Sequence, residues 1–184
     1  MSDALTQTQE IFNCLERVPN GLIARDLRRG LVLIISAHLK ILTDLQPRHP
    51  YLWDLNNRLQ RLNRIPSAFE KKAIRNSADR KQASQALEVL HGLIKASGRS
   101  GLLPQRDADL AAAAALFSAQ QIAVETARQA AKDAENVRAY KQALNFAYQA
   151  QALCKRLPPL MAEALTESVT ADVERLEARL NKVA

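Results

Sequence analysis

The sequence predicts an all-α protein, either a multi-helix bundle or an irregular helical array of about six to eight helices. Good helix formers, chiefly Leu, Ala, Gln, Arg, Lys and Glu, dominate the 184 residues, whereas aromatic residues make up only 4%. The five glycines and seven prolines are few, and most fall between stretches with helical periodicity. An apolar content of 47% is that of a globular chain rather than a disordered one.

The first two predicted helices lie on either side of the turn at residues 18–21, Val-Pro-Asn-Gly. Before the turn, apolar residues recur at helical spacing up to Val18. After it, the stretch 25–45 has basic residues on one side, including Lys40, and an apolar arc on the other. The arc contains Leu27, Leu31, Ile34, His38, Ile41, Leu42 and Leu45. Its middle turns are apolar almost all round, which predicts the central, buried helix of the N-terminal half.

The next predicted helix begins near Pro50, carries Leu52, Leu55, Leu59 and Leu62 on one face, and ends before Pro66. Ser67 and Glu70 have the spacing of a capping box, which predicts a new helix start there. From Ala83 onward the periodicity is strong and continues to residue 97.

Residues 98–104 form the predicted linker between an N-terminal helical half, 1–97, and a C-terminal half, 105–184, within one domain or two. The second half is rich in alanine, with 17 alanines between residues 108 and 152. Residues at intervals of seven from Leu110 to Ala131 predict a heptad-like seam, which also includes Ala113, Gln120, Ala127 and Ala134. Residues 132–136 predict a break or kink. Two further helices are predicted on either side of Pro158 and Pro159.

The location predicted for the chain is the cytoplasm, with no membrane span. The N-terminus has neither the basic nor the apolar region of a signal peptide. No apolar run approaches the roughly 20 residues that a bilayer span requires. The two cysteines, Cys14 and Cys154, are too few and too far apart for a disulfide framework, which indicates buried thiols in a reducing compartment.

Motifs for catalysis or cofactor binding are weak, so we expect no enzyme, no cofactor and no metal. His38 lies among aliphatic residues without a carboxylate or thiol on its arc, which is typical of a satisfied core histidine. Glu88 and His91 match Glu-x-x-His, but a di-iron bundle requires two such motifs and two further glutamates. Neither cysteine has a histidine near it in sequence, and no phosphate-binding glycine motif is present.

The positive charge is concentrated in residues 58–81. The chain has a net charge of +7, and this window contributes +6 of it, with only Glu70 and Asp79 as acidic residues. The candidate anion or nucleic-acid patch consists of Arg58, Arg61, Arg64, Lys71, Lys72, Arg75, Arg80 and Lys81. Such a patch can bind phosphates. It can equally be a solvated face, or it can pair with the acidic C-terminal helix, which contains Glu163, Glu167, Asp172, Glu174 and Glu177.

Three functions follow as hypotheses, in decreasing order of support. The first is a non-enzymatic helical module or adaptor that binds a protein partner or associates with itself. The second is a nucleic-acid-associated protein that contacts phosphates through residues 58–81. An enzyme with a scattered site is the third and least favoured reading.

Overall fold

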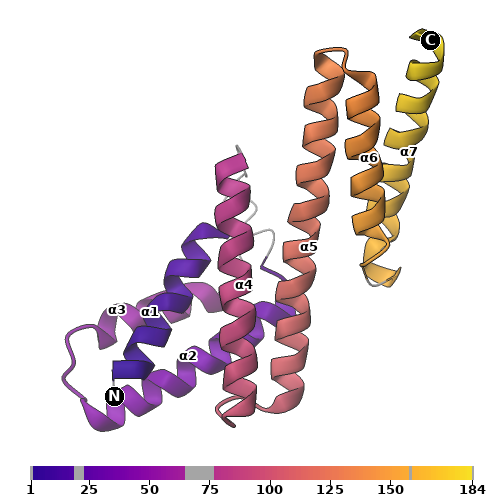
Figure 1. Cartoon of the computed structure of the whole chain (residues 1–184). Coiled ribbons are helices and arrows are strands. Elements are labelled where there is room, and N and C mark those ends of the chain that lie inside the picture. The colour runs from indigo at the N-terminus through magenta and orange to yellow at the C-terminus, as the bar shows by residue number, and fades with distance from the viewer. Residues whose placement is uncertain (1, 19–22, 65–76, 158, 184) are drawn as a thin grey trace. The chain divides into compact units, whose positions relative to one another are not determined.

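The computed structural model describes residues 2–18, 23–64, 77–157 and 159–183. Seven helices make up nearly all of these residues and no strand occurs among them, which confirms the predicted all-α class. The helices are α1 (Ser2–Arg17), α2 (Arg25–Leu45), α3 (Leu52–Asn63), α4 (Ser77–Arg99), α5 (Gln105–Asn136), α6 (Tyr140–Cys154) and α7 (Pro159–Val183) (Figure 1). The chain divides into two compact units, residues 1–119 and 120–184. The predicted capping box at Ser67 and Glu70 lies outside the described residues.

In unit 1, α2 has the predicted central position and the predicted bounds, Arg25 to Leu45. It packs against α1, α3 and α4. Its buried residues are Leu27, Gly30, Leu31, Ile34, Ile35, His38, Leu39 and Leu42. Ile41 and Leu45, which the apolar arc included, are instead exposed. With 3.6 residues per turn, Leu45 lies five turns after the buried Leu27 and on the same side of the helix, so its exposure comes from its position at the last residue of α2 and not from its side.

Two glycines set the distance of closest approach to α5 in unit 1. A Cβ atom on Gly30 of α2 would lie 2.4 Å from the Cβ atom of Ala111, and one on Gly98 of α4 would lie 2.6 Å from that of Ala108. Real Cβ atoms essentially never come that close. The α4–α5 turn contains Gly101 with φ of +77°, and Leu103 beyond it is buried. Small residues therefore bring these helices close together at both places.

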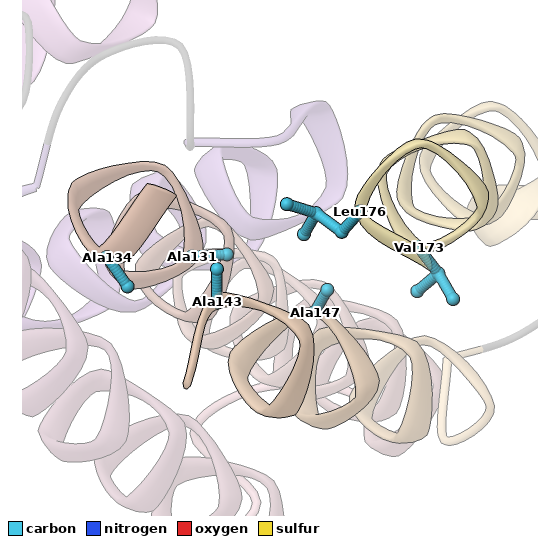
Figure 2. Packing of buried hydrophobic residues seen from close by; sticks show 6 residues of the cluster. All are labelled: Ala131, Ala134, Ala143, Ala147, Val173 and Leu176. Atoms are coloured by element: carbon cyan, nitrogen blue, oxygen red, sulfur yellow. The ribbon is translucent and has the colours of Figure 1, made fainter. Parts of the chain in front are cut away.

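Unit 2 contains residues 120–136 of α5 together with α6 and α7. Its core cluster consists of small side chains from α5 and α6 with two larger ones from α7: Ala131, Ala134, Ala143, Ala147, Val173 and Leu176 (Figure 2). Leu176 points toward the alanines in that view. Because alanine has the shortest apolar side chain, it allows neighbouring helix backbones to approach closely.

The turn between α5 and α6 follows directly after the break or kink predicted at residues 132–136, which therefore lies a few residues early. The helix continues to Asn136 and ends in a Schellman motif. The Arg138 N–H donates to the Glu135 carbonyl (2.9 Å), and the Ala139 N–H donates to the Ala134 carbonyl (2.9 Å). Arg138 takes the left-handed conformation, with φ of 61°, that glycine usually supplies at this position.

The predicted heptad seam fails in the first part of α5. Leu110 is exposed, and the buried residues there are instead Ala108, Ala111, Ala112, Ala114, Ala115 and Ser118. From Val124 onward the predicted seam is buried, at Val124, Ala127, Ala131 and Ala134. Alanine occurs on nearly every side of the first part, so its periodicity does not identify the buried side.

The domain division at residues 98–104 stays a prediction, because compact packing units are not a test of independent folding.

Candidate binding surfaces on the α2–α3 hairpin

The first residue of the predicted basic patch, Arg58 on α3, is a structural contact rather than a free cation. Its Nε atom lies 3.0 Å from Asp54 Oδ2, and its Nη1 atom lies 3.9 Å from Glu16 Oε1 of α1. The guanidinium carbon also lies 5.7 Å from the centre of the Phe12 ring, in a cation–π arrangement. Arg58 therefore links α3 to α1, and little of its charge is left for an external anion.

The next two residues of the patch, Arg61 and Arg64, have exposed side chains at the C-terminal end of α3. No salt bridge to a described residue involves either of them. The end of the helix is held by Arg28 of α2, whose Nη1 atom donates to the carbonyls of Arg64 (2.7 Å) and Leu62 (3.3 Å). These bonds satisfy carbonyl groups that the end of a helix leaves unpaired. They fix the helix turn that presents both guanidinium groups.

The remaining patch residues come from the next stretch of the chain. Lys71, Lys72 and Arg75 lie outside the described residues. Arg80 on α4 is half-buried, and its Nε atom has no hydrogen-bond partner among the described residues, whereas Lys81 is exposed. The structure thus brings Arg61 and Arg64 together on one helix end, and a single patch of eight cations stays a prediction.

The exposed side of α3 carries more than its arginines. With 3.6 residues per turn, five residues share the side opposite the buried Leu52 and Leu55, and we call them the α3 arc: Trp53, Asn57, Gln60, Arg61 and Arg64. Asn57 is half-buried, the other four are exposed, and Arg64 is the residue that caps the C-terminal end of the helix. Trp53, the only tryptophan of the chain, is 77% exposed. Trp53 was not among the predicted site residues, although a tryptophan directly beside the leucine face of α3 was a signal for it.

A second surface, on α2, was also missed. Leu33, Ala37, Ile41 and Leu45 stand four residues apart and form what we call the α2 ridge. The three large side chains are 38%, 40% and 56% exposed, respectively. Rows of every fourth residue are the ridges that pack into the grooves of a neighbouring helix. In the described part of the chain, this row is left largely open to solvent.

His38 lies in the core, as predicted, but it is not a satisfied histidine. Its side chain is 6% exposed, and neither ring nitrogen has a hydrogen-bond partner among the described residues. Burial lowers the pKa of the imidazole, because the charged form would lose its hydration without gaining a partner. The pattern of apolar neighbours predicted the burial of His38 but could not show whether a partner reaches its nitrogens.

The other chemical candidates do not assemble into a site. Glu88 is exposed and His91 is half-buried, and no group of His, Cys, Asp or Glu among the described residues could hold a metal ion. His49 has a local partner, since its Nδ1 atom accepts a hydrogen bond from the Tyr51 N–H at 3.2 Å. The thiols of Cys14 and Cys154 are free and buried, and burial raises the pKa of each.

In unit 2, the polar side chains form ion pairs between α5 and α7. Both Arg128 Nε and Arg128 Nη2 lie 2.8 Å from Asp172 Oδ2. Glu135 accepts hydrogen bonds from Arg175 and Arg179, and the bond from Arg175 lowers the pKa of its carboxyl group. Two acidic residues of α7 thus have partners in their own unit: Asp172 pairs with Arg128, and Glu177 accepts a hydrogen bond from Tyr148 of α6.

No family model, no curated protein and no solved structure matches the chain. No helix in the described residues is both long enough and apolar enough to cross a membrane.

Proposed function

We propose that the protein is a non-enzymatic helical module that binds a protein partner through the α2 ridge. The observation that carries this proposal is the row of Leu33, Ile41 and Leu45, three large aliphatic side chains that are each more than a third exposed. A row at this spacing fits the groove of a partner helix, and burial of a large aliphatic side chain contributes roughly 1.5–3 kcal/mol. The partner is a helix of another protein or of a second copy of this chain.

The test is capture of partners from a nuclease-treated lysate by the wild-type chain and by the double variant Ile41→Gln/Leu45→Gln. Glutamine keeps the helix propensity and removes the apolar side chain. Val89→Gln is the matched control, because Val89 on α4 is 39% exposed and lies outside the ridge. We expect the wild type and the control to capture one discrete protein from the lysate or, if the partner is a second copy of the chain, to sediment as dimers. The double variant should neither capture that protein nor form dimers. Equal behaviour of all three proteins would overturn the proposal.

Nucleic-acid binding through phosphates is the second candidate function, and the exposure of Arg61 and Arg64 without a described ion-pair partner favours it. A cationic surface releases counterions when it binds phosphates, so the affinity should fall steeply as salt rises. Replacing Arg61, Lys72 and Arg75 with Glu should abolish binding. No detectable binding of the wild type to nucleic acid at low salt would exclude this function.

A further inference from the structure

We infer that the α3 arc is a binding face for single-stranded nucleic acid, with Trp53 as the stacking platform. The inference rests on the second candidate function, because it requires phosphate contact by Arg61 and Arg64. It goes beyond that function in naming the helix face, the aromatic anchor and the single-stranded form of the ligand.

The first step concerns the indole ring. Trp53 is 77% exposed, although burial of an aromatic ring would contribute substantially to stability. Because Leu52 and Leu55 already fill the buried side of α3, the fold does not use this ring. An exposed indole face is the group on which proteins stack unpaired bases, and the bases of a duplex are not available for such stacking.

The second step concerns the polar groups that follow Trp53 on the same side of the helix. Asn57 and Gln60 can donate to and accept from base edges, and Arg61 and Arg64 can bind phosphates. The rise of an α-helix places Arg61 about 12 Å and Arg64 about 16 Å beyond Trp53 along the axis. Ring stacking and phosphate contacts would therefore fall on different nucleotides of one strand.

The third step concerns charge and the choice between nucleic acid and protein. The α3 arc contains no carboxylate, and the acidic residue beside it, Asp54, is held by Arg58 at 3.0 Å. It also contains no aliphatic side chain, in contrast to the α2 ridge. Amide and guanidinium groups around one aromatic ring match an anionic, base-carrying strand better than they match the apolar centre of a protein interface.

The experiment uses the full chain and a labelled oligothymidylate of about 12 nucleotides, within the range that such binding proteins cover. Binding is measured by anisotropy and by quenching of the emission of Trp53, which is the only tryptophan. Trp53→Leu removes the aromatic face but keeps an apolar side chain, whereas Trp53→Phe keeps a ring. We expect Trp53→Leu to bind roughly 5- to 100-fold more weakly and Trp53→Phe to bind nearly as the wild type does.

The arginines are tested through the dependence of binding on salt. Arg61→Gln and Arg64→Gln should each reduce the slope of log affinity against log salt by about 0.7, the value for one phosphate of a single strand. Arg99→Gln is the matched control, an exposed arginine on α4 outside the arc, and it should leave the slope unchanged. Far-UV circular dichroism of each variant checks that the fold is retained.

Three outcomes would overturn the inference. If Trp53→Leu binds as the wild type does and a duplex of the same length binds equally well, the contacts are to phosphates alone, and only the second candidate function survives. If the wild type does not bind at low salt, both fail. If polyglutamate of equal charge displaces the strand, and its binding is weakened by Trp53→Leu to the same extent, the α3 arc binds an acidic polypeptide instead.

Discussion

The two units of the molecule are stabilised by different means. The largest fully buried side chains are Leu, Ile and Val, and all of them except Ile122 and Leu176 belong to unit 1. Unit 2 has a core made mainly of alanines and ion pairs that link α5 to α7. Stability in unit 1 therefore depends on the apolar area removed from water, and stability in unit 2 depends on close helix approach and on charge.

Truncation of a core side chain in unit 1 should have the largest effect. Ile34→Ala should reduce the free energy of unfolding by about 2–5 kcal/mol, because it removes a buried side chain and leaves a cavity. Leu33→Ala, at the adjacent and partly exposed position, is the control and should cost less than about 1 kcal/mol. Denaturant unfolding followed by circular dichroism measures both. Equal losses would show that α2 is not the buried helix of unit 1.

In unit 2 the damaging change is the opposite one, an increase in side-chain size. Ala143→Leu should destabilise by about 1–3 kcal/mol, because residue 143 is fully buried in the alanine-rich cluster and the added atoms have no space. Ala152→Leu, an exposed alanine of the same helix, should change stability by about 0.5 kcal/mol or less. If Ala143→Leu were neutral, the helices of unit 2 would not be closely packed.

Loss of an ion pair should affect unit 2 in a way that depends on pH and salt. Glu135→Gln should destabilise by about 1–2 kcal/mol at neutral pH, since the Glu135 side chain is mostly buried while Arg175 and Arg179 are partly exposed. The Glu135 pKa is lowered by Arg175, so its contribution is present above the ordinary carboxyl pKa of 4.5 and is lost as the pH falls through the lowered value.

Thermal unfolding of wild type and Glu135→Gln between neutral and acidic pH, at low and high salt, measures this effect. The difference between the two proteins should narrow in acid and in high salt. A difference that stayed constant under all conditions would mean that packing, not charge, explains the loss.

The stability of unit 1 should depend on pH through His38. The pH range of this effect lies near the histidine pKa, above the range in which the carboxylates of the unit 2 ion pairs titrate. The imidazole pKa is lowered in the folded state, so the unfolded chain takes up the proton first. Stability is thus highest above the ordinary histidine pKa of 6.5 and decreases as the pH falls below it. His38→Leu should remove this decrease and, because it also removes two unpaired polar atoms, should stabilise the neutral-pH protein by about 1 kcal/mol.

The measurement is urea unfolding of wild type and His38→Leu above and below pH 6.5, with His91→Leu as a half-exposed control. If the wild type and His38→Leu lost stability equally on acidification, a group other than His38 would be responsible.

The sequence predicted the elements whose signals are local and repeated. Prolines and glycines that end helices, together with apolar residues at a period of 3.6, predicted the bounds of α2, the start of α7 near the two prolines and the all-α class. The buried side of α5 did not follow, because a run of alanines is apolar on all sides. The lack of a partner for the His38 nitrogens among the described residues, and the pairing of Arg58 with Glu16, are both set by side chains from other helices. The sequence therefore indicated the basic residues of α3 but not which of them remain available to a ligand.

The contact between Gly30 and Ala111 has an evolutionary consequence. The two positions share a fixed space that admits one methyl group, so a larger residue at one of them requires a smaller residue at the other. Diverged relatives should therefore show exchanged volumes, such as alanine at position 30 with glycine at position 111. A glycine in the middle of a helix is otherwise unfavourable, so such paired exchanges would distinguish descent from a common ancestor from the chance similarity of alanine-rich helices.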